Sequence, residues 1–224
     1  MNRKTSTLLF FIFLFSTICF AAKDKKPFTG KIVYEISYPD SDFTQEEISM
    51  LPNRMTLYLG KNHLKTSIPN KLGVTEIIFN IEDHSSTALI NSTGNKYAIT
   101  RHQKEKKDQK KPTITITNET KEISGYQCKK AFITPYDENG VPRPKIEVYF
   151  TEEIQHPGIF ELNPEFEGIP GFPMEYELNN DNIPQKLKVI EVNKRSVSKK
   201  QFEIPKDYEQ HQKLEIEENY RRKN

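Results

Sequence analysis

The sequence has few of the residues that mark common enzyme and metal sites. Its 224 residues include two cysteines, five histidines and no tryptophan. No two histidines lie within four residues of each other and the HExxH pattern is absent, so no zinc site is predicted. The nucleophile-elbow pattern GxSxG and a phosphate-binding glycine loop are absent too. The sequence therefore predicts no catalytic residue, no metal ligand and no cofactor, and a protein that is not an enzyme.

A strong excess of either charge is also lacking. Lys and Arg number 33 against 31 Asp and Glu, a formal net charge of +2, which argues against a nucleic-acid binder. The densest basic stretch, residues 101–111, has six Lys or Arg against two acids. We expect an exposed hairpin loop there, with contact to a polyanion or an anionic headgroup as the alternative. No aromatic residue within this stretch offers a platform for base stacking.

No apolar run is long enough for a transmembrane helix. The run over residues 8–20 is about 13 residues long, whereas a spanning helix needs roughly 17–25. Basic residues precede it, and Cys19 and Ala21 give small residues at positions −3 and −1 of a cleavage site. This pattern predicts a cleaved secretory signal peptide over residues 1–22. We expect an exported protein with no integral membrane span, periplasmic or extracellular, with association with the outer membrane as one option.

Removal of the signal peptide would leave Cys128 as the single cysteine. An internal disulfide is then excluded. The simpler interpretation is a small buried hydrophobic residue in a strand. The alternative is a reactive or intermolecular thiol, for which Lys129 and Lys130 would give little help, because strand neighbours point to opposite faces.

The dominant pattern is the alternation of apolar and polar residues that is typical of half-buried strands. Residues 28–38 show it clearly, with Ile32, Tyr34 and Ile36 at every second position. Further β-prone segments lie at 55–59, 64–68, 77–81, 87–90, 96–100, 114–116, 130–134, 146–150, 174–178 and 187–192. Short turn sequences separate them, so the sequence predicts a mainly β fold, a curved antiparallel sheet of about ten strands with one or two short helices.

The domain organisation is simple. Residues 23–208 are expected to form a single β-rich domain. Residues 43–51 are the clearest candidate for a short helix. Residues 209–224 are charged and contain few apolar residues, so we expect a frayed helix or a disordered tail.

Two segments have unusual local character. In residues 120–131, Gly125 interrupts a strand-like run and predicts a bulge or a bend. In residues 166–177, two glycines and two prolines predict a rigid turn. Its apolar side chains either plug one end of the sheet or form the rim or lid of an apolar cavity. The candidate surface for an apolar ligand or a partner comprises Phe166, Ile169, Phe172 and Met174.

These two segments carry a resemblance to a known family. The first resembles an Ile-x-Gly-Tyr-x-Cys-x-Lys-Ala pattern, and the second a Gly-Leu-Pro-Gly-Leu-Ile turn that leads into a strand. The matching motif residues include Gly125, Tyr126, Cys128, Gly168, Pro170 and Gly171. The chain thus resembles, over residues 28–208, the GLPGLI family or a related family of secreted domains of unknown function, common in Bacteroidetes. The resemblance implies no catalytic residues and a half-barrel similar to that of the periplasmic lipoprotein carriers (LolA-like), with a helix or two in its mouth.

A curved sheet with one apolar face can hold an acyl chain. We therefore expect a non-enzymatic binding protein of the bacterial envelope, for a lipid, an acyl chain or a lipidated partner protein. The alternative is a module for protein–protein interaction or assembly in the envelope, which would bind a protein partner along a sheet edge or through residues 169–172.

Overall fold

The protein is described by a computed structural model, which covers residues 26–39, 41–71, 73–92, 94–102, 110–137, 139–180 and 183–212. Most of the basic stretch 101–111 and most of the tail 209–224 lie outside these residues, as does the predicted signal peptide. The strands are β1 (Gly30–Ser37), β2 (Arg54–Leu59), β3 (His63–Asn70), β4 (Gly73–Asn80), β5 (Ser85–Ser92), β6 (Asn95–His102), β7 (Thr113–Ile123), β8 (Tyr126–Thr134), β9 (Ile146–Thr151), β10 (Phe172–Asn180), β11 (Ile183–Asn193) and β12 (Glu209–Gln212). The short helical elements are α1 (Gln45–Ile48), α2 (Ile159–Leu162), and the 3-10 turns η1 (Pro164–Phe166) and η2 (Lys199–Phe202). The predicted fold class is confirmed.

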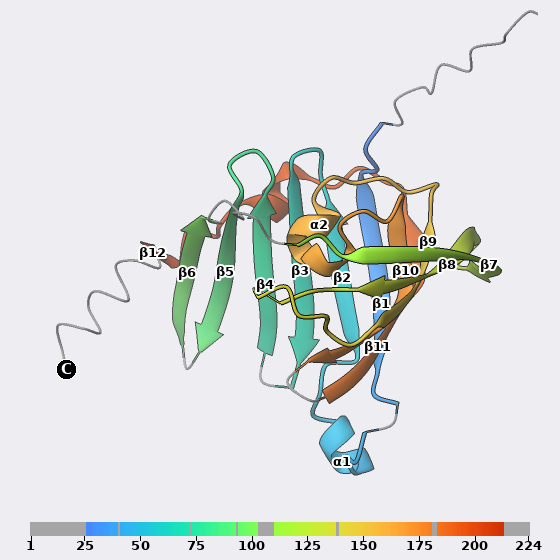
Figure 1. Cartoon of the computed structure of the whole chain (residues 1–224). Helices are drawn as coiled ribbons and strands as arrows, with labels where there is room; N and C mark the ends of the chain where they lie inside the picture. Colours follow the sequence, from blue (N-terminus) through green and yellow to red (C-terminus); the bar gives the residue numbers. More distant parts are fainter. Residues whose placement is uncertain are drawn as a thin grey trace, which may run out of the picture.

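All twelve strands belong to one open sheet with the order β12-β6-β5-β4-β3-β2-β1-β11-β10-β9-β8-β7. Strands β1 to β6 form an antiparallel meander, as do β7 to β11. The pairing of β1 with β11 joins these two halves, and β12 pairs parallel to β6. The sheet curves strongly, so that β7, β8 and β9 lie in front of β1 and β2 while β5 and β6 extend to the side (Figure 1).

The main core fills the concave side between the two halves of the sheet. The alternation over residues 28–38 sends Ile32, Tyr34 and Ile36 into it, as predicted. The buried Tyr34 hydroxyl donates a hydrogen bond of 2.6 Å to the carbonyl of Pro173. This bond ties β1 to the start of β10 across the core.

A second, smaller apolar cluster lies on the convex side of β4–β6. It contains Ile78, Leu89 and Ala98, one residue from each strand. Three residues from the end of η2 onward pack against this cluster: Phe202, Ile204 and Tyr208. The convex side of β4–β6 is therefore covered by the C-terminal part of the described chain.

The structure differs from two predictions, the helix over residues 43–51 and the frayed or disordered tail over residues 209–224. The helix expected over residues 43–51 is the single turn α1, which begins after the capping box formed by Thr44 and Glu47. Residues Glu209–Gln212 form β12 instead of a frayed helix or a disordered segment, because their backbone pairs with β6. The remainder of the predicted tail lies outside the described residues.

Gly125 is part of a two-residue hairpin turn between β7 and β8, so of the predicted bulge or bend the structure shows the bend. Ser124 has φ of 50° and Gly125 has φ of 81°, the left-handed pair that closes a tight hairpin. The Ser124 hydroxyl donates to the carbonyl of Val189 at 2.8 Å, so the turn rests on β11. The irregularity in this hairpin lies instead in β7, between Ile116 and Thr120.

We expect Gly125→Ala to lower the free energy of unfolding by about 1–2 kcal/mol, because an alanine is strained in the left-handed region. Urea denaturation of a purified chain that begins at residue 23 measures this. Gln127→Ala, an exposed position on the neighbouring strand, should change stability by less than about 0.5 kcal/mol. Equal effects of the two substitutions would contradict the assigned turn.

Candidate functional site

The structure buries all four residues of the predicted apolar surface. Phe166, Ile169, Phe172 and Met174 are each at most 3% exposed and belong to the main core. The Phe166 ring meets Tyr176 edge-on with 4.8 Å between the centroids. In correction of the predicted surface, these side chains plug the concave side and are not accessible to a ligand or partner in this arrangement.

The glycines of this segment have steric roles. At Gly171 a Cβ atom would lie 2.2 Å from the carbonyl oxygen of Thr151, so only glycine allows this approach of β9. Gly168 has φ of 103°, which also favours glycine. Pro170 is exposed, and its carbonyl accepts a hydrogen bond from the Gln155 side chain at 3.1 Å. The motif is thus explained by the geometry of the turn.

Cys128 and Tyr126 lie on β8 and are buried in the main core. Burial raises the pKa of the Cys128 thiol to about 11. The thiol is 1% exposed and donates to the Tyr126 carbonyl at 3.4 Å. A neutral buried thiol is a poor nucleophile, so the structure agrees with the simpler interpretation of Cys128.

Strands β4, β5 and β6 present an apolar row on their concave side. Ile77, Ala88 and Ile99 are cross-strand partners in adjacent strands, so their side chains share one face. Ile77 packs against the main core, which identifies this face as the concave one. All three side chains are half-buried. The next apolar residue of β5 on this face, Ile90, is 40% exposed.

Short helix α2 lies at one end of this part of the sheet (Figure 1). The Glu161 carboxylate meets the Nδ1 atom of His84, in the β4–β5 turn, at 3.1 Å. Gly158 packs so closely on Ile81 that a Cβ atom there would lie 2.7 Å from the Ile81 side chain. At the outer edge of the row, the rings of Tyr97 and His211 lie 5.8 Å apart. Helix α2 thus lies at the end of β4 and β5 where these strands are joined by their turn, and β12 lies beside the row at the outer edge of β6.

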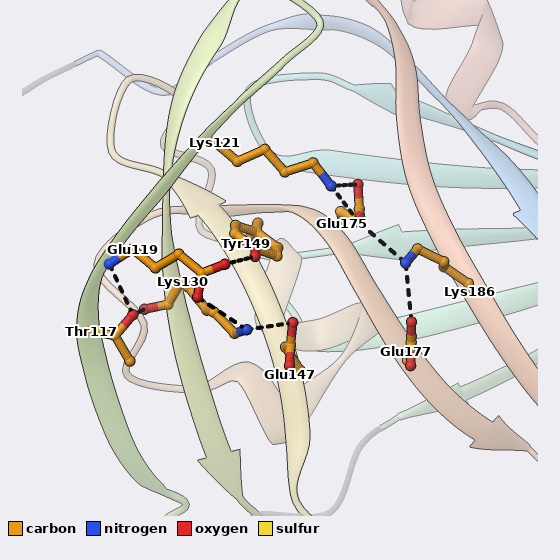
Figure 2. Close-up of polar contacts among 9 residues, drawn as sticks. All are labelled: Thr117, Glu119, Lys121, Lys130, Glu147, Tyr149, Glu175, Glu177 and Lys186. Atoms are coloured by element: carbon orange, nitrogen blue, oxygen red, sulfur yellow. Dashed lines mark hydrogen bonds and ion pairs between the residues drawn. The ribbon is translucent and has the colours of Figure 1, made fainter.

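A charged cluster covers part of β7–β11 (Figure 2). At its centre, the Glu175 side chain is 5% exposed and receives two hydrogen bonds of 2.8 Å from Lys121. Lys186 lies 3.3 Å from the same carboxylate and 3.1 Å from Glu177. Burial would raise the pKa of Glu175, but the hydrogen bonds and charges of the two lysines outweigh it and hold this pKa below its usual value.

The other half of the charged cluster is centred on Lys130. Its ammonium lies 2.9 Å from Glu147 and 3.3 Å from Glu119, and the hydrogen bond to Glu147 raises the pKa of Lys130. The Tyr149 hydroxyl donates to Glu119, which lowers the pKa of that carboxylate. The Thr117 hydroxyl accepts the Glu119 backbone N–H (Figure 2). Each charge has a partner within the cluster, so the cluster offers no unpaired group to a ligand.

An open depression of about 830 Å³ lies between the ends of β7 and β8 and the η1 turn. Its charged lining residues are three basic and three acidic: Lys110, Lys111, Arg143, Asp137, Glu165 and Glu167. One basic–acidic pair, Lys111 and Glu167, is in contact at 3.2 Å. The balanced charge gives this depression no preference for an anion or a cation.

Neither a metal-binding cluster nor a membrane-spanning helix is seen in the part of the chain that the structure describes. No three metal-ligating side chains come together there. Among the same residues, no helix has the length and apolar character needed to span a bilayer.

No family model and no curated protein matches this chain. The resemblance to the GLPGLI family therefore stays a prediction. The solved structures that are similar to this chain include a β-barrel-like protein of domain of unknown function DUF1849 from Brucella abortus. The two chains are 8% identical with a TM-score of 0.36, and the match covers 76% of this chain and 99% of that one. Another is LprF from Mycobacterium bovis, with 9% identity and a TM-score of 0.34, covering 81% of this chain and 90% of that one. At these TM-scores the similarities carry nothing about a ligand or a site.

Proposed function

We propose that this protein is an exported, non-enzymatic binding protein that holds the acyl chain of a lipid or of a lipidated protein on the concave side of β4–β6. The observation that carries the proposal is the apolar row of Ile77, Ala88 and Ile99. These side chains lie on the concave face but stay half-exposed, whereas the convex face of the same strands is covered. A methylene group transferred from water onto such a surface gains up to about 0.8 kcal/mol.

Protein–protein interaction through a sheet edge receives less support. Strand β7 is the last strand of the sheet on its side. Its register is interrupted between Ile116 and Thr120, and such bulges hinder pairing with a further strand. The apolar row is therefore the preferred site.

We expect Ile90→Glu to weaken binding of a fluorescent long-chain fatty acid at least tenfold, because it places a carboxylate beside the apolar row. Fluorescence titration of the mature chain gives the dissociation constant. Ile190→Glu is the matched control, since Ile190 is 43% exposed on β11, which β1, β2 and β3 separate from β4 and the apolar row.

The control variant should bind as the unaltered protein does. Absence of fatty-acid binding to the unaltered protein would refute the proposal. Equal losses in the two variants would place the binding site away from the apolar row.

A further inference from the structure

Arg101 lies at the edge of the apolar row, on the same concave face. Its cross-strand partner is Ser86, whose own partner on β4 is the core residue Phe79. The Arg101 Nε atom donates to the Ser86 hydroxyl at 3.1 Å, which confirms that the two side chains point the same way. Along β6, Arg101 is two residues from Ile99, so the guanidinium lies beside the row and not beneath it.

The Arg101 guanidinium has hydrogen-bonding capacity left over. Among the described residues it takes part in no ion pair, and its side chain is exposed. The acidic side chains at this end of the sheet have other partners: Glu161 contacts His84, and Asp83 accepts the backbone N–H of Ser85. A fixed cation beside an apolar strip is complementary to a ligand that has an apolar tail and an anionic head.

The apolar row is bordered differently on its two sides. On one side lie the core residue Phe79, Ser86 and Arg101, and on the other lie Thr75, Ile90 and Tyr97. Same-face neighbours along a strand are about 7 Å apart. Arg101 therefore stands at one border of the apolar residues, and an acyl chain that begins there can run across the strands over Ile99, Ala88 and Ile77.

We propose that the ligand of this site is a long-chain fatty acid, with its carboxylate on Arg101 and its chain lying across Ile99, Ala88 and Ile77. Arginine suits this role because its planar fork can bind a carboxylate through two hydrogen bonds. This inference rests on the proposed acyl-chain function and deepens it by naming the head group.

The test compares palmitate with the uncharged 1-monopalmitoylglycerol, both below their aggregation concentrations, by calorimetric titration of the mature chain. Arg101→Gln should weaken palmitate binding about tenfold, the loss expected for one charge-assisted contact at an exposed site. Its affinity for monopalmitoylglycerol should stay unchanged. The palmitate affinity of Arg101→Lys should lie between those of the unaltered protein and Arg101→Gln, since lysine keeps the positive charge but lacks the planar fork of the guanidinium.

Arg54→Gln is the matched control, because Arg54 is exposed on β2 next to the core-facing Met55 and so points to the convex side. It should leave both affinities unchanged. If both ligands bind the unaltered protein equally and Arg101→Gln changes neither, the head-group assignment fails while the acyl-chain function stands. Tighter binding of dipalmitoyl phosphatidate than of palmitate would overturn the single-chain ligand. If none of these ligands binds, the proposed function itself fails.

Discussion

Replacing Phe172 by alanine is expected to lower the free energy of unfolding by about 3–5 kcal/mol, the usual cost of emptying a buried aromatic site. Phe172 is fully buried at the start of β10. Its ring packs against that of Tyr34, with 6.5 Å between the centroids. The close approach of Gly171 to Thr151 fixes the backbone next to it, so the site has little freedom to collapse around the cavity. Urea denaturation of the chain from residue 23 onward, followed by circular dichroism, measures the change.

The result also distinguishes the two interpretations of residues 166–177. A plug that belongs to the core gives the full loss, whereas a lid that opens readily contributes little to global stability. A loss below about 1 kcal/mol would therefore favour the lid. Ile190→Ala, an exposed apolar position on β11, serves as the control and should stay within about 0.5 kcal/mol of the unaltered protein.

The second large effect concerns the buried carboxylate of Glu175. Changing both of its lysine partners, in Lys121→Met/Lys186→Met, should lower the free energy of unfolding at pH 7 by about 3 kcal/mol. The reason is that a buried charge without a partner costs more than the pair contributes. The two lysines are themselves more than a third exposed, so water that reaches the vacated space limits the loss.

The pH dependence of this double variant should be opposite in sign to that of the unaltered protein. In the unaltered protein the folded-state pKa of Glu175 is depressed. Its contribution is therefore present above the ordinary carboxyl pKa and is lost as the pH falls through the folded-state value. Without the lysines, only burial remains, which raises the pKa. The variant should then gain stability as the pH falls from 7, when the folded state takes up a proton first.

Denaturation midpoints measured between pH 4 and pH 8 provide the test. Adding Glu175→Gln to the double variant removes the buried charge and should restore most of the lost stability and abolish the difference in pH dependence. A double variant as stable as the unaltered protein across this range would show that Glu175 is solvated without its lysines.

Much of the sheet could be predicted from local sequence because a half-buried strand displays its environment in its own alternation. The positions of Ile32, Tyr34 and Ile36 in the core follow directly from residues 28–38. Strand β12 was not predicted because its four residues, Glu209–Gln212, are polar and are held only by pairing with β6. A short polar edge strand leaves no periodic signal in the sequence.

The location of the candidate site could not be predicted from the sequence. Phe172 and Ile169 lie in a turn rich in glycine and proline, and such a turn is usually exposed, yet here the chain folds back into the concave side. The apolar row was missed for a different reason. Ile77, Ala88 and Ile99 lie in three separately predicted strands, and only the register between those strands brings them together.

The pairing of β1 with β11 also determines when the protein can fold. Lys31 pairs with Asn193, so β1, the first strand in the sequence, has neighbours on both sides only after β11 has been synthesised. Strands β1–β6 can pair locally, but the core on their concave side is completed by residues from β8–β11. Such long-range pairing is slow. The chain should therefore remain without a finished core until β11 has been synthesised, and a polypeptide in that state can still be threaded through a translocation pore.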